Sequence, residues 1–177
     1  MNILEKFHYC PVCGSKHFSA NGPKSLKCRN CNFEYFLNAS SAVVAFILNR
    51  NNELLVERRK YDPVKGTLDL PGGFVDVGET TEHGIAREVR EETGLEVSSA
   101  KYLFSLPNKY RYGGIDIPTL DLFFLCEVKD ELALQASDDA AECMWIPVDE
   151  IHTEQFGLRS VRQGLFDFIN WTAALSK

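Results

Sequence analysis

One segment of this 177-residue chain reads Gly73-Phe-Val-Asp-Val-Gly-Glu79-Thr-Thr-Glu-His-Gly-Ile-Ala-Arg87-Glu88-Val-Arg-Glu91-Glu92-Thr-Gly94-Leu95. Its middle part, residues 80–93, has the pattern of an α-helix, because Thr80-Thr81 stands where a helix begins and Gly94 follows the last turn. The preceding Pro71-Gly72-Gly73 is typical of a turn that ends a helix or strand. The segment therefore predicts a helix that is entered through a glycine-rich turn.

Three glutamates of this helix carry its chemical signal. At about 100° per residue, Glu88, Glu91 and Glu92 share a stripe roughly 100° wide. Like charges at this spacing repel by a few tenths of a kcal/mol per pair, and the helix dipole disfavours acids in the last turn. A purely structural helix would gain by replacing them, so the stripe indicates a bound hard divalent cation. The alternative is a solvated charged face.

The surroundings of the stripe fit a binding site. Ile85, Ala86 and Val89 lie on the adjacent helix face and are predicted to pack inward. Arg87 precedes Glu91 by four residues, so its guanidinium can orient a carboxylate. Gly73 has no side chain, and its carbonyl can therefore approach the same cation.

The quoted segment resembles the signature of the Nudix hydrolases: Gly, five residues, Glu, seven residues, then Arg-Glu-apolar-x-Glu-Glu-x-Gly-apolar. The resemblance extends over about residues 41–177. It implies a Nudix α/β/α sandwich with a mixed β-sheet. It also implies hydrolysis, with Mg²⁺ or Mn²⁺, of the pyrophosphate in a nucleoside diphosphate that is linked to another group, releasing a nucleoside monophosphate.

The same resemblance implies the roles of individual residues. Glu79 would support the site by pairing with Arg87. The general base is left open among Glu91, Glu92 and Glu142, with Glu91 or Glu92 preferred. The implied catalytic set is Arg87, Glu88, Glu91 and Glu92, and the implied Mg²⁺ ligands are Gly73, Glu88, Glu91, Glu92 and Glu142.

Outside this segment, strand patterns dominate. Residues 42–48 form a continuous apolar run of strand length, typical of a strand that is covered on both faces, and residues 54–59 return as a second strand. Further strands are expected at about 95–106, 118–128 and 142–146, and a second helix over 158–175. These elements predict an α+β domain with a mixed sheet.

Four cysteines near the N-terminus form two CxxC pairs, Cys10/Cys13 and Cys28/Cys31, with fourteen residues between the pairs. Four thiolates on two tight turns complete a tetrahedral zinc site, and Gly14 and Asn32 tolerate the left-handed backbone that such turns need. The alternative is two redox pairs or unconnected thiols. The segment resembles a zinc ribbon with a structural Zn²⁺, and we expect a ribbon over 1–38 and a Nudix domain over 39–177.

Composition limits the functional classes. With 45% hydrophobic and 25% charged residues, the chain is typical of a globular protein. Its net charge of −6 repels a phosphate backbone, so non-specific nucleic-acid binding is not expected as the main function. Neither a membrane span nor a signal peptide is indicated, and we expect a cytoplasmic protein. The oligomeric state is left open, with a homodimer as one alternative.

The substrate is indicated only by class. A ribbon before a Nudix domain resembles the NADH pyrophosphatases, but of their Ser-Gln-Pro-Trp-Pro-Phe-Pro-x-Ser motif only Ser105 and Pro107 are present here. The replacement loop contains Lys109, Tyr110 and Arg111, which offer cations for phosphate and a ring for base stacking. An amphipathic hairpin edge is the alternative reading of that loop. Arg58 is a further phosphate candidate, unless it is simply solvated.

Three functional classes follow. The first is a hydrolase of NADH or NAD, ADP-ribose or a nucleotide-sugar, with house-cleaning hydrolysis of nucleoside triphosphates as a close variant. The second is a catalytically silent nucleotide sensor, which would not need all three helix glutamates. The third is a nucleic-acid-binding protein that reads through the ribbon, which is locally basic at Lys16, Lys24, Lys27 and Arg29.

Overall fold

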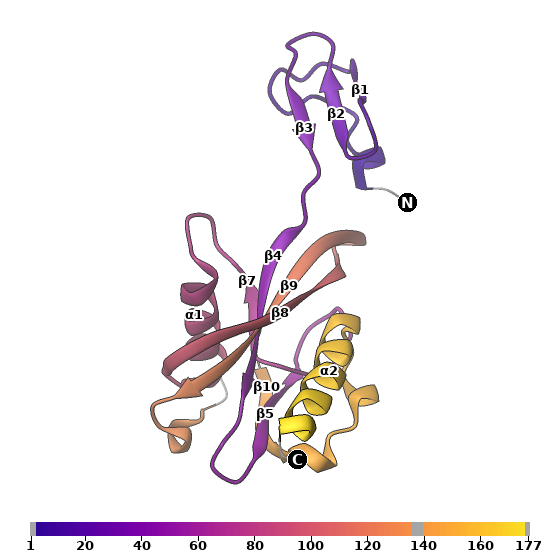
Figure 1. The fold of residues 1–177 in the computed structure, drawn as a ribbon. Coiled ribbons are helices and arrows are strands. Elements are labelled where there is room, and N and C mark those ends of the chain that lie inside the picture. Colours follow the sequence, from indigo (N-terminus) through magenta and orange to yellow (C-terminus); the bar gives the residue numbers. More distant parts are fainter. Residues whose placement is uncertain (1–2, 136–139, 176–177) are drawn as a thin grey trace. The chain divides into compact units, whose positions relative to one another are not determined.

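The computed structural model describes residues 3–135 and 140–175. The chain divides into two compact units, which can be followed in Figure 1. Unit 1 consists of residues 1–39 and 109–118, and unit 2 of residues 40–108 and 119–177. None of the described helices is long and apolar enough to cross a membrane.

Unit 1 is built on a short antiparallel sheet of β1 (Phe18–Ala20), β2 (Ser25–Cys28) and β3 (Glu34–Phe36), preceded by the 3₁₀ turn η1 (Ile3–Lys6). Its core is small and contains cysteines as well as apolar side chains. Leu4, Phe18 and Leu26 are buried with Cys10 and Cys28. A core of this size cannot supply much stability by itself, so a bound metal would add a large part of it.

Unit 2 contains two sheets. The first has the order β7-β4-β9-β8, and within it β4 pairs in parallel with β9 and antiparallel with β7, so this sheet is mixed. The second has the order β10-β5-β6 and is antiparallel. The elements are β4 (Ser40–Ile47), β5 (Glu53–Arg59), β6 (Leu68–Asp69), β7 (Gly72–Phe74), α1 (Thr81–Thr93), β8 (Val97–Tyr112), β9 (Ile115–Val128), β10 (Ala140–Pro147) and α2 (Arg159–Leu175), with 3₁₀ turns η2 (Glu131–Ala133), η3 (Val148–Glu150) and η4 (Thr153–Gln155). The end of β8 and the start of β9, within residues 109–118, are counted with unit 1.

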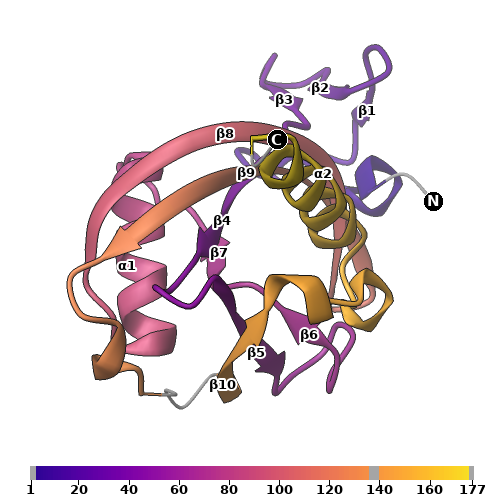
Figure 2. The same ribbon diagram turned by 60° about the horizontal axis from the view of Figure 1, so that its bottom comes forward.

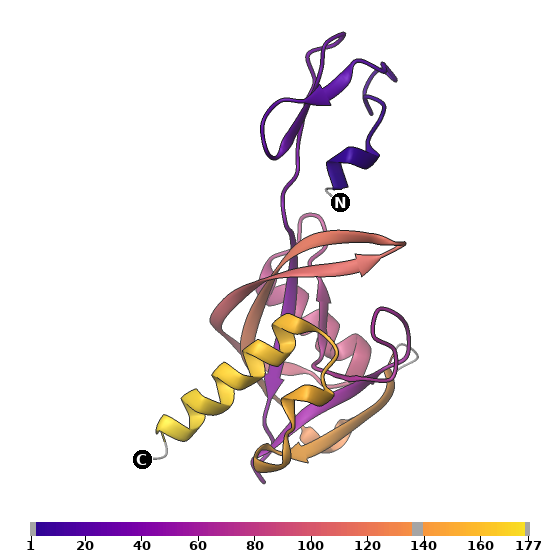
Figure 3. The ribbon, with the colours of Figure 1, turned by 90° about the vertical axis from the view of Figure 1, so that its right-hand side faces the viewer.

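Strand β4 is covered on both faces, as its apolar run predicts. Val44 and Phe46 pack into the core that includes α2, whereas Val43, Ala45 and Ile47 pack into the core that includes α1. Figure 2 shows α1 and α2 on opposite sides of the strands, and Figure 3 shows α2 in front of them with α1 behind. The predicted α/β/α sandwich with a mixed sheet and two long helices is confirmed.

Two expectations need correction. Pro71-Gly72-Gly73 is not only a turn between elements, because Gly72–Phe74 forms β7 and pairs with β4. The predicted strand 95–106 continues to Tyr112 as β8, and β9 begins at Ile115, so the expected loop shrinks to a turn at Gly113-Gly114. Both glycines of that turn have positive φ, which explains how two long strands reverse in so few residues.

Candidate active site

Helix α1 has the ends that its sequence predicts. The Thr80 hydroxyl accepts a hydrogen bond from the His83 amide at 3.2 Å, which caps the N-terminus. Gly94 closes the other end with φ 72°, and its amide donates to the Arg90 carbonyl. Ile85 and Val89 are completely buried on the inner face. The helix is therefore fixed in rotation, and its glutamates are held in one direction.

Arg87 is the centre of an ion network on this helix. Its Nε and Nη2 donate to the two carboxylate oxygens of Glu79, both at 2.9 Å. Its Nη1 donates to Glu88 at 2.9 Å and to Glu91 at 3.1 Å. The implied pairing of Glu79 with Arg87 is confirmed. A guanidinium with two hydrogen bonds to one carboxylate keeps a fixed orientation. Arg87 therefore holds the side chains of Glu88 and Glu91 in fixed orientations.

Glu79 is locked to the turn that precedes α1. It accepts a hydrogen bond from the Asp76 amide at 3.0 Å as well as those from Arg87. The hydrogen bonds from Arg87 and from this amide lower the pKa of Glu79 to about 2. Glu79 also raises the already high pKa of Arg87. This pair is ionised throughout the neutral range and forms the rigid support of the site.

The glycines of β7 lie against two of the helix glutamates. The Gly72 amide donates to Glu92 Oε2 at 2.8 Å. A Cβ atom built on Gly73 would lie 2.5 Å from Glu88 Oε1, so the Glu88 carboxylate rests directly on the bare backbone of Gly73. Gly72 itself has φ 152°, and a Cβ there would meet the Val43 carbonyl oxygen at 2.1 Å. Glycine is thus required twice, once for the strand pairing and once for the carboxylate.

The protein disfavours the ionised form of both Glu88 and Glu92. Burial raises the pKa of Glu88, although Arg87 acts against this. Burial raises the pKa of Glu92 well above its ordinary range, and the nearby carboxylate of Glu57 raises it further. Carboxylates that disfavour their own ionisation in this way are ready to accept a cation.

Sequence reasoning missed Glu57 and Asp69, two buried acids beside these helix glutamates. Glu57 is 6% exposed on β5 and Asp69 is 4% exposed on β6, and the two are paired in the strand register. Arg59 Nη1 donates to Asp69 Oδ2. The available signal was an acid inside an apolar strand and another between two leucines, Leu68 and Leu70.

The remaining candidates have other neighbours. Arg58 Nε donates to Glu142 Oε2 at 3.4 Å, and Arg58 Nη1 donates to the Gly66 carbonyl at 3.0 Å. Because side chains alternate along a strand, Glu142 and Glu57 point to opposite faces of β10-β5-β6. Glu142 is therefore not brought together with Glu92, and its role as a metal ligand stays a prediction.

The predicted substrate loop is the distal part of the β8–β9 hairpin and belongs to unit 1. Lys109 and Arg111 are exposed there, and Tyr110 is half-buried. Arg111 Nη1 donates to Asp116 Oδ1 at 2.9 Å across the hairpin. The hairpin alternative for this segment thus describes its structure, whereas substrate binding by these three residues stays a prediction.

The four predicted zinc ligands are brought together in unit 1. Cys10, Cys13, Cys28 and Cys31 place their sulfur atoms within 4.8 Å of one another, the only cluster of possible metal ligands this tight within residues 3–135 and 140–175. The Cys10–Cys31 and Cys13–Cys28 sulfur distances are 3.6 and 3.7 Å. Thiolates on one tetrahedral zinc ion lie about 3.8 Å apart.

Both cysteine turns are closed in the same way. The amide of Gly14 donates to the Cys10 carbonyl at 2.8 Å, and that of Asn32 to the Cys28 carbonyl at 3.1 Å. Gly14 and Asn32 have φ 70° and 63°, the left-handed backbone that the sequence predicts. A hydrogen bond from the Cys31 backbone amide is the largest cause that lowers the pKa of Cys28, to about 6, and so favours the thiolate form that binds metal.

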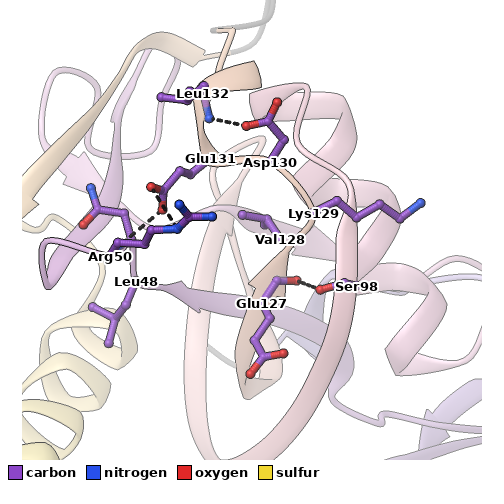
Figure 4. Close-up of a pocket in the computed structure, with 10 residues that line it drawn as sticks. Leu48, Arg50, Ser98, Glu127, Val128, Lys129, Asp130, Glu131 and Leu132 are labelled. Atoms are coloured by element: carbon purple, nitrogen blue, oxygen red, sulfur yellow. Dashed lines mark hydrogen bonds and ion pairs between the residues drawn. The ribbon is translucent and has the colours of Figure 1, made fainter.

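A separate pocket of about 480 Å³ lies beside the ends of β4 and β9 in unit 2. Figure 4 shows Arg50 beside Glu131, with which it forms an ion pair, and the Ser98 hydroxyl, which donates a hydrogen bond to the Glu127 carbonyl. Lys129, also on its wall, pairs with Glu96. Since these charges pair with one another and none belongs to the α1 network, we place the candidate active site at α1, β7 and β5 and not here.

Comparisons with known proteins concern the family and the fold of the chain. The family model described as NUDIX domain matches residues 39–168. An ADP-ribose pyrophosphatase of Methanocaldococcus jannaschii is 31% identical over 141 residues, which cover 78% of each chain. The NAD-capped RNA hydrolase NudC of Vibrio atlanticus is 29% identical over 106 residues, which cover 60% of this chain and 39% of that protein.

Solved structures share the fold. A NUDIX hydrolase from Nitrosomonas europaea superposes with a TM-score of 0.71 at 21% identity and covers 92% of this chain and 90% of its own. At this level of identity the likeness concerns the fold alone. Since the chain spans about two-fifths of the Vibrio protein, the activity of that whole protein is not transferred by the match.

Proposed function

The chain belongs to the NUDIX family of hydrolases, and we propose that it cleaves the pyrophosphate bond of a nucleoside diphosphate linked to another group, using Mg²⁺ or Mn²⁺. ADP-ribose is the first candidate substrate, because a relative of similar length is named an ADP-ribose pyrophosphatase. The observation that carries the proposal is the α1 network, in which Arg87 holds both Glu88 and Glu91, and Glu88 lies against Gly73.

The residues present fit a hard cation. Glu88, Glu91 and Glu92 and the Gly73 carbonyl offer only oxygen atoms, the ligands that Mg²⁺ and Mn²⁺ prefer. Burial is the main reason that the pKa values of Glu88 and Glu92 are raised, and neighbouring carboxylates add to it, so a cation would relieve the cost of ionising both groups. A cation held by these residues would supply positive charge to offset the negative charge that develops during phosphoryl transfer.

The protein's own residues orient the general base, and the base accepts a proton from the attacking water. We assign Glu91 as the general base, since its side chain is 54% exposed and can reach water, whereas Glu92 is held by the Gly72 amide. Arg87 orients Glu91 from the Glu79 support. Water oxygen bonds to phosphorus, its proton passes to the carboxylate, and the bridging P–O bond breaks. ADP-ribose would give AMP and ribose 5-phosphate.

We propose further that the four cysteines hold a structural Zn²⁺. All four ligand positions are filled by protein thiols, so no position is left for water or substrate. Arg58, Lys109, Tyr110 and Arg111 remain candidates for substrate binding, and Glu142 an additional ligand that would have to leave Arg58.

The proposal is tested by product analysis with Mg²⁺ over ADP-ribose, NADH, NAD, nucleotide-sugars, diadenosine polyphosphates and nucleoside triphosphates. Glu91→Gln and Glu92→Gln should each lose on the order of 10²-fold or more in turnover. Glu96→Gln is the matched control, because Glu96 follows the helix and pairs with Lys129 outside the network.

Each outcome decides between the classes. Metal-dependent release of a mononucleotide from ADP-ribose, lost in the two variants, supports the proposal. Release of pyrophosphate from nucleoside triphosphates alone would favour the house-cleaning variant. Binding of a nucleotide with no turnover of any compound would replace the hydrolase with a silent sensor.

A further inference from the structure

A row of three side chains crosses the small sheet of unit 2. The strand register places Glu57 of β5 opposite Asp69 of β6 on one side and opposite Cys143 of β10 on the other. Residues that are directly opposite in antiparallel strands point to the same face of a sheet. Asp69, Glu57 and Cys143 therefore share one face, with Glu57 in the middle.

This face is turned toward α1. Leu55, two residues before Glu57 on the same side of β5, packs into the core with Ile85 and Val89 of the helix. Cys143 Sγ lies 3.7 Å from the backbone carbonyl oxygen of Glu92. The Glu57 carboxylate is thus presented to the side of α1 that carries Glu92, from the opposite wall of the site.

Glu57 has a polar atom that nothing in the described structure satisfies. Its residue is 6% exposed, and its buried Oε2 has no hydrogen-bond partner. Its charged neighbours are mostly acids: burial and Asp69 raise the pKa of Glu57 to about 8, Glu88 adds to this, and only Arg59 acts against it. Arg59 itself donates to Asp69. A buried carboxyl oxygen that stays unsatisfied destabilises the folded protein.

Protonation of Glu57 alone does not give Oε2 a hydrogen-bond partner. A neutral carboxylic acid needs an acceptor for its O–H group, and Oε2 has none in the structure. A divalent cation between β5 and α1 would satisfy Oε2 and would remove the repulsion between Glu57 and Glu92 in one step.

We propose that Glu57 is a further protein ligand of the divalent cation, supplied by strand β5 from the wall opposite α1. This inference rests on the proposed function, because it concerns a cation at the same glutamates. It adds a residue outside the quoted helix segment and makes the metal centre a site between two elements instead of a stripe on one helix.

The test is Mn²⁺ binding by Glu57→Gln, measured by electron paramagnetic resonance of free Mn²⁺ on the zinc-loaded full chain. Gln keeps the shape and removes the charge. We expect at least about a tenfold loss of Mn²⁺ affinity or the loss of a bound ion. We also expect that Mn²⁺ raises the Tm of the wild type by more than that of the variant. Without added Mn²⁺ the zinc-loaded variant should be at least as stable as the zinc-loaded wild type, since the mutual repulsion is gone.

Glu53→Gln is the matched control on the same strand. Glu53 accepts from Asn49 Nδ2 at 2.6 Å, away from the helix glutamates, so its replacement should leave Mn²⁺ binding unchanged. If Glu57→Gln does not fold, Glu57→Asp keeps the charge but withdraws it by one methylene, and a comparable loss of affinity is expected.

The outcomes separate this inference from the proposed function. Wild-type affinity in a folded Glu57→Gln, together with a loss in Glu92→Gln, overturns the inference and leaves the hydrolase intact. Absence of Mn²⁺ binding by the wild type overturns both. Loss of binding in Glu57→Gln with no turnover of any substrate by the wild type supports the Glu57 ligand and rejects the hydrolase.

Discussion

The cysteine cluster of unit 1 and the carboxylates of unit 2 both gather acidic groups, but they do so in opposite ways. The four sulfur atoms lie within 4.8 Å of one another on two turns of the same design. The carboxylates come from a helix and two strands, and Arg87 occupies the space between two of them. The cysteine cluster already offers four ligands for one metal ion. At the carboxylates, the guanidinium of Arg87 pairs with two of the acids.

The difference fits the functions that we propose for the two sites. A structural metal site gains from being closed, because every open ligand position admits water. A site that must accept a substrate phosphate needs open positions and therefore needs support from outside the ligands. Glu79 gives that support through Arg87, and β7 gives it through its two glycines.

The largest effect is expected from Cys28→Ser. Structural zinc contributes on the order of 10 kcal/mol to a small zinc-folded unit, and unit 1 has only a small apolar core. We expect loss of zinc and of the ordered unit 1, with turnover per folded unit 2 within about twofold of the wild type. Zinc analysis, amide hydrogen exchange and ADP-ribose hydrolysis measure these three quantities.

Val12→Ala is the control for this change, since Val12 lies between two of the cysteines and is 65% exposed. A purified, folded Cys28→Ser protein with a full zinc complement would contradict the assignment of this cysteine as a ligand.

The two glycines of β7 should separate folding from function. Gly72→Ala meets the Val43 carbonyl oxygen at 2.1 Å in a backbone region that L-residues avoid, so we expect a loss of about 3 kcal/mol or more in the free energy of unfolding. Gly73→Ala meets only the movable end of Glu88. It should leave the Tm nearly unchanged and lower activity by about 10–100-fold.

Urea unfolding and product release, measured on the same two variants, decide this prediction. Equal losses of stability in both variants would show that Gly73 serves the strand pairing and not the Glu88 carboxylate.

Acid should lower the stability of unit 2 through Glu79 and that of unit 1 through Glu34. The pKa of Glu79 is lowered from its ordinary value of 4.5 to about 2, mainly by Arg87. Its stabilising effect is therefore complete above about pH 4.5 and is lost as the pH falls toward 2. Glu79→Gln should flatten this part of the stability curve of unit 2, measured by urea unfolding between pH 2 and 6.

Glu34 is the counterpart in unit 1. Hydrogen bonds from Asn21 and Ser25 lower the pKa of Glu34, so its stabilising effect is likewise lost in acid. Glu34→Gln should change the acid response of unit 1 and leave that of unit 2 unaltered. A change in both units from either variant would mean that they unfold together.

The smallest effects are expected at the exposed arginines. Arg58→Ala and Arg111→Ala remove single cations that are already paired with Glu142 and Asp116. Exposed pairs contribute up to about 1 kcal/mol, so KM for ADP-ribose should rise by no more than about fivefold. Arg50→Ala, paired with Glu131, is the control. An unchanged KM in both variants would remove these residues from substrate binding.

The local features of both regions could be predicted from the sequence. The ends of α1 at Thr80 and Gly94, the left-handed Gly14 and Asn32, and the Glu79–Arg87 pair all depend on neighbours within a few residues or on one motif. Their signals are therefore complete in the local sequence.

The features that were missed depend on strand pairing. Glu57 becomes part of the site only because β5 pairs with β6 and β10, and no local pattern shows which acid in a strand will face a helix. In the sequence Gly72 indicates a turn, and only its pairing with β4 makes it part of a strand. The predicted loop at 109–112 became strand because a two-glycine turn needs no further residues.

Strand β4 has a consequence for the synthesis of the chain. Its residues 43–47 are all apolar and almost completely buried, yet its parallel partner β9 ends about 80 residues later. At roughly 5–20 residues per second, β4 waits on the order of ten seconds for that partner to be translated. Strand β7 is available earlier and pairs with one edge of β4, but the edge that will bind β9 stays open during this interval and can associate with other nascent chains. The strand that contributes to both cores of the finished sandwich is therefore exposed at one edge while the chain is still being synthesised.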